Sequence, residues 1–217
     1  MLFQAFEVLL NTLRILSFII VVFQAIGLLG LIFVGSSRFR EDSTINKSLI
    51  LLIIGIVEII YLAINQRIYY LIQGIVGPIT LQLLAMQDAL NNLIPNIISL
   101  LTFGVLFLYL GISNRRNYGK LLIFSAIFRI VCGIILILPY SITFLSNLPH
   151  TITLQDIQLA YIIIPIASIF MITSSVFFMI YAFRIDKKVL FFSSIFLLVA
   201  SSLFFVNSLV QHMILNF

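Results

Sequence analysis

Residues 114–129 read NRRNYGKLLIFSAIFR, and the rest of the chain is organised around this stretch. A short basic turn containing Arg115, Arg116 and Lys120 leads directly into an apolar helix. Nine residues after that lysine, the helix carries a single arginine, Arg129. A basic turn of the same kind occurs once before this stretch and once after it. The stretch therefore predicts pairs of apolar helices joined by basic turns.

The composition indicates a membrane protein. The chain has 217 residues, of which 62% are hydrophobic and only 9% are charged, and its mean hydropathy is +1.24. A soluble domain carries roughly a quarter of its residues as charged side chains. Apolar runs approach or exceed the ~18–20 residues that cross a bilayer. Only helices or closed barrels satisfy the backbone in lipid, and runs without period-2 alternation favour helices.

We therefore predict an all-α integral membrane protein that forms one polytopic domain over residues 1–217. Six transmembrane helices are expected, arranged as three helical hairpins with short basic cytoplasmic turns. The segment 79–93 is expected to form a helix in the outer interface, or to belong to a re-entrant loop entered at 74–78. The transmembrane helices are expected over residues 6–34, 48–67, 95–113, 120–139, 154–184 and 188–214.

The positions of the basic residues predict the orientation. Nine of the 12 Lys and Arg residues lie in or next to the three odd-numbered connections, and basic residues in short loops stay cytoplasmic. With six helices, both termini are then predicted on the non-cytoplasmic side. The net charge of +5 does not indicate nucleic-acid binding, because the cations lie in turns between membrane helices. The nine residues of the cytoplasmic turns are Arg38, Arg40, Lys47, Arg115, Arg116, Lys120, Arg184, Lys187 and Lys188.

The three expected hairpins resemble one another weakly. Each has an apolar helix end, a basic turn that closes on lysine, and a further apolar run. This pattern is typical of a triplicated helical hairpin. The alternative is that each cytoplasmic turn is basic for topological reasons alone.

Three polar residues are expected near the middle of the membrane. At a rise of ~1.5 Å per residue, Glu58 lies about 16 Å beyond Lys47, and Arg129 lies about 13 Å beyond Lys120. By the same rise, Gln24 lies about 16 Å from the cytoplasmic end of the first helix. These depths correspond to the midplane of a ~30 Å hydrocarbon core.

Glu58 and Arg129 carry opposite charges, and inserting either one alone costs roughly 2.5–3.5 kcal/mol. Three interpretations remain open. The two side chains form an ion pair that pins the second helix to the fourth, or they serve proton or ion movement or substrate binding. Alternatively, they do not touch, and Glu58 is protonated or each side chain faces a partner subunit. Gln24 either joins them or hydrogen-bonds between helices.

The remaining polar residues of the apolar helices indicate packing. Cys132 is the only cysteine and is interpreted as a small buried hydrophobe. Small hydroxyl side chains allow close helix packing, with a hydrophilic path as the alternative. These hydroxyl residues are Thr102, Thr173, Ser174, Ser175, Ser193, Ser194, Ser201 and Ser202.

The sequence contains no pattern for metal-dependent or nucleophilic catalysis and no phosphate-binding loop. We therefore expect no catalytic residue, no metal site and no cofactor other than bound lipids. The first functional hypothesis is a non-catalytic subunit or scaffold of a larger membrane complex, with other subunits or further copies of the chain as partners. The alternative is a small-solute, ion or proton transporter or channel that uses Glu58 and Arg129. A membrane-embedded enzyme acting on lipid or quinone is a third possibility.

Overall fold

The computed structural model of the protein describes residues 2–39, 52–60, 94–113, 118–146 and 154–215. Within these ranges the chain is helical except at Tyr118 and at residues 185–187. Among the described residues, four helices are long and apolar enough to cross a membrane, and their spans are Ile15–Ser36, Gly119–Ile137, Ile162–Arg184 and Lys188–Val210. The protein is therefore an all-α protein with the features of a multi-pass membrane protein.

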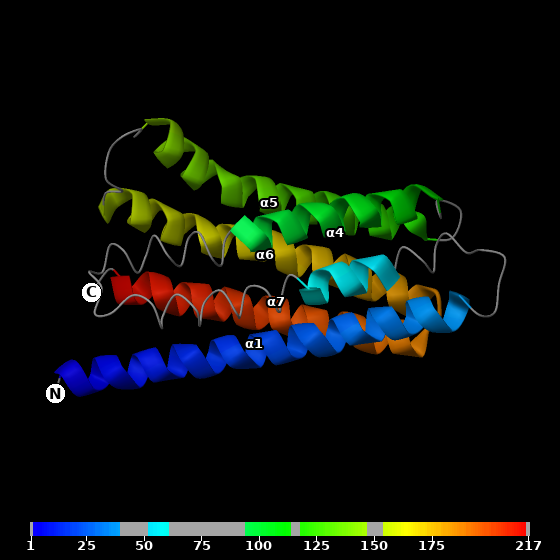
Figure 1. Ribbon diagram of the computed structural model, residues 1–217, viewed down its shortest axis with the longest axis horizontal. Helices are drawn as coiled ribbons and strands as arrows, with labels where there is room; N and C mark the ends of the chain where they lie inside the picture. Colours follow the sequence, from blue (N-terminus) through cyan, green and yellow to red (C-terminus); the bar gives the residue numbers. More distant parts are fainter. Residues whose placement is uncertain (1, 40–51, 61–93, 114–117, 147–153, 216–217) are drawn as a thin grey trace.

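Figure 1 shows the helices as a bundle of roughly parallel rods. Residues 52–60 form a short helix, here called segment 52–60, that lies beside the five longer described helices (Figure 1). The longer helices are α1 (Leu2–Phe39), α4 (Ile94–Ser113), α5 (Gly119–Ser146), α6 (Leu154–Arg184) and α7 (Lys188–Leu215).

The helix bounds agree with the sequence prediction for α6 and differ by one residue at a single end for α4 and α7. α1 begins four residues earlier and ends five residues later than predicted. The largest difference at a single end concerns α5, which continues through Pro139 and ends at Ser146 instead of stopping at the proline. The candidate membrane span of this helix ends at Ile137, so Pro139 lies just beyond it. A proline removes one backbone hydrogen bond and can kink a helix without ending it. The predicted features at 79–93 and 74–78 lie outside the described residues.

Each described helix packs on the next one along the chain. Contacts join α4 to α5, α5 to α6, and α6 to α7, and α7 packs in turn on α1. Segment 52–60 connects α1 to α4. It lies against α1, and its Glu58 accepts a hydrogen bond from α4. The described helices thus form a ring in chain order. The N-terminal end of α1 and the C-terminal end of α7 lie at the same end of the helix bundle (Figure 1).

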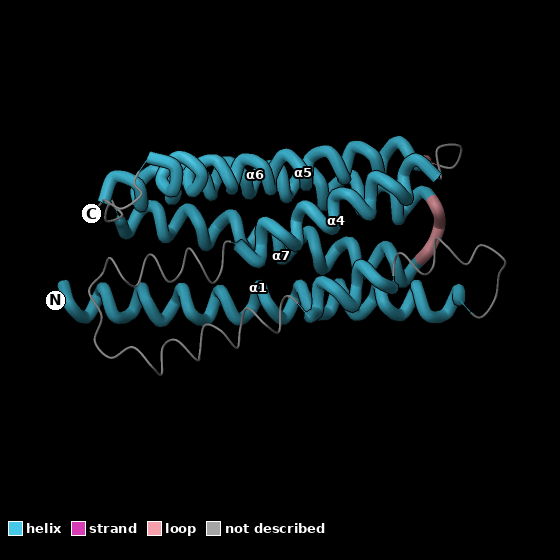
Figure 2. The backbone as a smooth tube through the Cα atoms, turned by 45° about the horizontal axis from the view of Figure 1, so that its top comes forward, coloured by secondary structure: helices cyan, strands magenta, loops and turns pink. Residues whose placement is uncertain are grey.

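The opposite end of the bundle contains the turns. The turn at residues 185–187 joins α6 to α7 at this end, as Figure 2 shows. Tyr118, just before α5, has φ 59°, and Asp186 has φ 52°. Both are left-handed conformations that non-glycine residues adopt rarely, mostly in tight turns. The guanidinium carbon of Arg184 lies 6.0 Å from the centre of the Tyr118 ring, so the two turns are neighbours.

The buried apolar side chains form two clusters along the bundle. The turn-end cluster includes Leu28, Phe107, Leu122, Phe178 and Leu190. The far-end cluster contains Ile97, Leu100, Cys132, Leu136, Ala167 and Met171. Cys132 is buried and unpaired, which agrees with its interpretation as a small hydrophobe.

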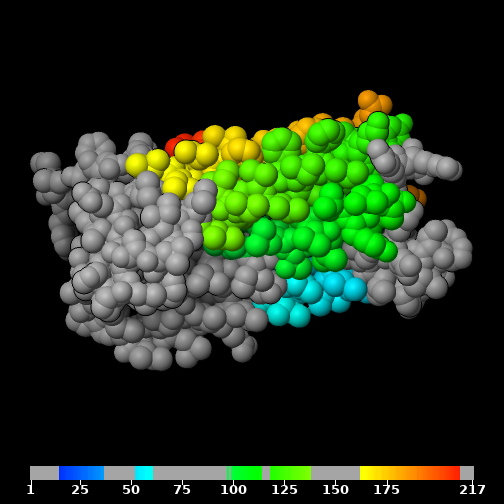
Figure 3. Space-filling view, turned by 90° about the horizontal axis from the view of Figure 1, so that it is seen from above, coloured from blue at the N-terminus to red at the C-terminus, as the bar shows by residue number. Residues whose placement is uncertain are grey.

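The outward-facing large side chains of the described helices are also apolar. On α1, the exposed residues Ile15, Phe18, Val22, Ile26, Leu29 and Phe33 recur every three or four positions. Exposed isoleucines and phenylalanines occur on the other helices too. Figure 3 shows the surface that α4, α5, α6 and segment 52–60 form together. An apolar exterior around a bundle with polar residues inside is the arrangement that lipid favours.

Candidate functional site

A buried polar layer crosses the bundle where the two apolar clusters meet. On α5, Arg129 lies between Ala126 of the turn-end cluster and Cys132 of the far-end cluster. On α6, Ser174 has the same relation to Phe178 and Met171. The layer consists of Glu58, Ser99, Ser125, Arg129, Ser174, Ser175 and Ser201, together with the ring of Phe103.

Arg129 occupies the centre of this layer. It is 7% exposed, and its Nε donates a hydrogen bond to Ser174 Oγ at 3.2 Å. Its guanidinium carbon lies 4.0 Å from the centre of the Phe103 ring, which is fully buried. A guanidinium over an aromatic face is attracted by the electron-rich ring, and the attraction grows when water is excluded. Arg129 therefore links α5 to both α4 and α6.

Ser125 and Ser174 make a reciprocal contact between α5 and α6. Ser174 Oγ donates to the carbonyl oxygen of Ser125 at 2.7 Å. Ser125 Oγ lies 2.9 Å from the carbonyl oxygen of Ser174 and 3.0 Å from its hydroxyl. Both residues are fully buried, and Ser125 lies one helical turn before Arg129. Two small residues at this crossing let the backbones approach closely enough for the hydroxyls to reach across.

Glu58 reaches the same layer from segment 52–60. Its side chain is 9% exposed, and Ser99 Oγ on α4 donates a hydrogen bond to its Oε2. Its other carboxyl oxygen, Oε1, is buried without a hydrogen-bond partner. A buried polar atom without a partner costs free energy, and such atoms often mark functional positions.

Glu58 and Arg129 both contact the same face of α4. Ser99, which contacts Glu58, and Phe103, which contacts Arg129, are one turn apart on this helix. The side chains of Glu58 and Arg129 have opposite formal charges. Among the described side chains, however, no ion pair shorter than 4.0 Å joins the two. Their nearest polar contacts are with serines of neighbouring helices.

The layer continues from α6 to α7 through a second serine pair. Ser175 Oγ lies 3.0 Å from Ser201 Oγ, and both hydroxyls also bond to carbonyls of their own helices. Gln24 is half-buried on α1, one turn from Leu28 of the turn-end cluster. Within the described part of the chain, Gln24 makes no hydrogen bond to Glu58 or Arg129.

The basic side chains that the structure describes as exposed lie at the turn end of the bundle. Lys120, Arg184, Lys187 and Lys188 are all exposed there. Arg38 belongs to the last turn of α1, although its side chain is not described. The other predicted turn residues, Arg40, Lys47, Arg115 and Arg116, lie outside the described residues.

Sequence reasoning did not identify three members of the polar layer, namely Ser99, Phe103 and Ser125. Ser125 could have been found, because it precedes Arg129 by four positions and so shares its helix face. Ser99 and Phe103 could not have been found from the sequence, because their contacts with Glu58 and Arg129 depend on which face of α4 meets segment 52–60 and α5. In the described ranges, no group of three His, Cys, Asp or Glu side chains could hold a metal ion.

No protein-family model matches this chain, and no curated protein or solved structure is significantly similar to it.

Proposed function

We propose that the protein is a non-catalytic integral membrane subunit or scaffold of a larger membrane complex. The observation that supports this function is that the polar side chains of the layer bond to side chains of neighbouring helices. Arg129 contacts α4 and α6, Ser125 and Ser174 join α5 to α6, and Ser175 and Ser201 join α6 to α7. These contacts hold helices to one another, as expected of a rigid framework in lipid.

Affinity purification from membranes in a mild detergent tests this proposal. The tagged protein should co-purify with other membrane subunits, or with further copies of itself, in a fixed ratio measured by mass spectrometry. As a control, the same tag is placed on an unrelated multi-pass protein of similar size. Recovery of the protein as a monomer without any stoichiometric partner would contradict a subunit role.

The second candidate function is transport of a small solute, an ion or a proton through Glu58 and Arg129. It is favoured by Oε1 of Glu58, which is buried without a hydrogen-bond partner. An ionisable group inside a membrane often serves a transported species. If proteoliposomes that contain the wild type take up a small solute, an ion or protons, proteoliposomes that contain Glu58→Gln should show no such uptake. Ser202→Ala is a suitable control, because the Ser202 hydroxyl bonds only within its own helix, to the carbonyl of Leu198. Equal uptake in wild type and Glu58→Gln would contradict this candidate.

We further infer that six helices cross the membrane, with both ends of the chain on the non-cytoplasmic side. The start of α1 and the end of α7 lie at one end of the bundle, and exposed cations lie at the other. Basic residues in short loops stay cytoplasmic, which supports this orientation. Labelling of single introduced cysteines is a direct test, since the native Cys132 is buried. A cysteine at Lys187 should be protected in intact cells, and cysteines added at either end should react with an impermeant reagent.

We also propose that the helical hairpins are related by internal repetition. Two of the three turns support this proposal. Tyr118 and Asp186 both have positive φ, and each precedes a lysine by two residues. The leucines that follow, Leu122 and Leu190, are both 2% exposed. Exchanging residues 118–120 for 186–188 should therefore preserve folding, and loss of the folded protein would contradict the relation.

A further inference from the structure

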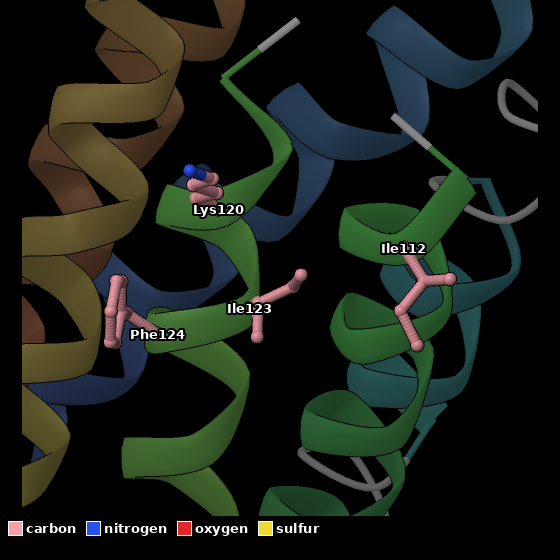
Figure 4. A pocket seen from close by; sticks show the side chains of 4 residues that line it. All are labelled: Ile112, Lys120, Ile123 and Phe124. Atoms are coloured by element: carbon pink, nitrogen blue, oxygen red, sulfur yellow. The ribbon is translucent and has the colours of Figure 1, made fainter. Parts of the chain in front are cut away.

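A shallow groove runs between α4 and α5 near the turn end of the bundle. It is lined by Ile112, Lys120, Ile123 and Phe124 and has a volume of about 250 Å³. Figure 4 shows that Ile123 on α5 points toward Ile112 on α4, and that Phe124 lies on the side of α5 that faces α6. Ile112 is 60% exposed and Phe124 is 48% exposed, so the groove opens outward from the bundle.

The groove is cationic at one end and apolar along the rest. Lys120 is the second residue of α5, and its side chain is exposed. Ile123 and Phe124 follow about one turn later, which places them roughly 5 Å further along the helix. Lys120 therefore lies nearest the turns, and the apolar lining extends from it along the membrane-spanning helix. A phospholipid has the same polarity, with its phosphate at the surface and its acyl chains below.

The surroundings of Lys120 also favour an anion. Arg184, Lys187 and Lys188 are exposed at the same end, with Asp186 as the described acidic residue of that turn. The contact between Arg184 and Tyr118 brings this second turn next to the start of α5. Clustered cations beside a membrane helix attract anionic lipid headgroups.

We propose that this groove binds an anionic phospholipid, with Lys120 contacting the phosphate and Ile112, Ile123 and Phe124 contacting an acyl chain. The apolar lining selects a lipid over a free phosphate ion, which would gain nothing from it. This site is independent of whether the protein acts as a subunit or as a transporter.

Native mass spectrometry of the protein released from nanodiscs tests the proposal. The nanodiscs contain equal amounts of phosphatidylglycerol and phosphatidylcholine. The wild type should retain phosphatidylglycerol preferentially, and Lys120→Gln should reduce this preference about fivefold, the effect of one cation near an anionic surface. Lys188→Gln is the matched control, because it removes the same charge at the same end without touching the groove. Because Lys188 belongs to the surrounding cations but not to the groove lining, its loss should reduce the preference less than the loss of Lys120 does.

A second variant separates the groove from the charge. Ile112→Trp keeps every cation but fills the groove with a larger ring, and it should also lower phosphatidylglycerol retention. Circular dichroism verifies that each variant is folded. Three results would overturn the proposal: equal loss in Lys120→Gln and Lys188→Gln, absence of any phosphatidylglycerol preference in the wild type, or displacement of the lipid by inorganic phosphate. The first would indicate a diffuse surface field and the last a site for a free anion.

Discussion

The α5–α6 contact and the α1–α7 contact hold two helix pairs together by different means. Between α5 and α6, hydrogen bonds join Ser125, Ser174 and Arg129. Aromatic rings add to this contact, since Phe128 stacks on Phe177 with ring centres 5.6 Å apart. Between α1 and α7, the hydroxyl of Ser193 bonds to its own helix, and the contact depends on close approach at Gly27 and Gly30.

This difference shows two solutions to one physical problem. Lipid tails are as apolar as leucine, so the hydrophobic effect does not drive one membrane helix onto another. Helices must then associate through interhelical hydrogen bonds or through dispersion contacts between closely spaced backbones. A contact made by hydrogen bonds should be weakened most when a bonding atom is removed. A contact made by closely spaced backbones should be weakened most when an atom is added between them. The predictions below test this contrast, beginning with the largest expected effect.

Arg129→Gln should destabilise the protein most. The substitution removes one of two buried side chains of opposite formal charge, together with the guanidinium contact with Phe103. Removing one of two buried opposite charges typically costs about 3–5 kcal/mol. Unfolding in mixed micelles, followed by circular dichroism because the chain has no Trp, measures the loss. Stability equal to that of the wild type would show that Arg129 does not hold α4, α5 and α6 together.

Gly30→Ala should have the next largest effect. A Cβ added at Gly30 would lie 1.9 Å from Ser193 Oγ and 3.0 Å from Ser193 Cβ, so the serine hydroxyl must rotate away or the two helices must separate. Overpacking of this kind typically costs about 1–3 kcal/mol.

Two further variants serve as controls for Gly30→Ala. Combining it with Ser193→Ala should restore part of the stability, because the nearest obstructing atom is the serine oxygen. Gly133→Ala should cost less, since its Cβ would meet the flexible end of Leu101 at 3.0 Å. If Gly30→Ala and Gly133→Ala were equally stable, close approach would not be what holds α1 to α7.

Ser174→Ala should have the smallest effect of the three. It removes the hydrogen bond from Arg129 and the bond to the carbonyl of Ser125. Interhelical hydrogen bonds in membrane proteins contribute about 0.6 kcal/mol on average and up to about 1.7 kcal/mol. Ser202→Ala, which loses only a bond within α7, should be nearly neutral in the same unfolding measurement. An equal loss in both variants would place the effect of Ser174 within its own helix.

The sequence predicts the helical class and the bounds of α4, α6 and α7 because long apolar runs bounded by charges leave few alternatives. The bounds of α6 follow from Arg184 at its end and from the basic turn after it. Pro139 predicts the end of α5, but the helix continues to Ser146. A proline removes one backbone hydrogen bond and can kink a helix without ending it.

The candidate site was predicted less completely than the fold. Counting residues along the expected helices selected Glu58 and Arg129, and both are buried. Depth alone does not determine which helix faces meet. The serine contacts of both residues and the position of Phe103 beside Arg129 depend on helix rotation and neighbour order, which a single sequence does not specify. These contacts therefore required the structure.

A double-mutant cycle on Glu58→Gln and Arg129→Gln tests most directly whether one polar layer joins segment 52–60, α4 and α5. Four proteins are compared by unfolding in the same micelles, namely the wild type, the two single variants and the double variant. We predict that the double variant loses less stability than the sum of the two single losses, by at least about 1 kcal/mol, as expected for coupled buried charges. Additive losses would show that Glu58 and Arg129 act separately and would contradict the account.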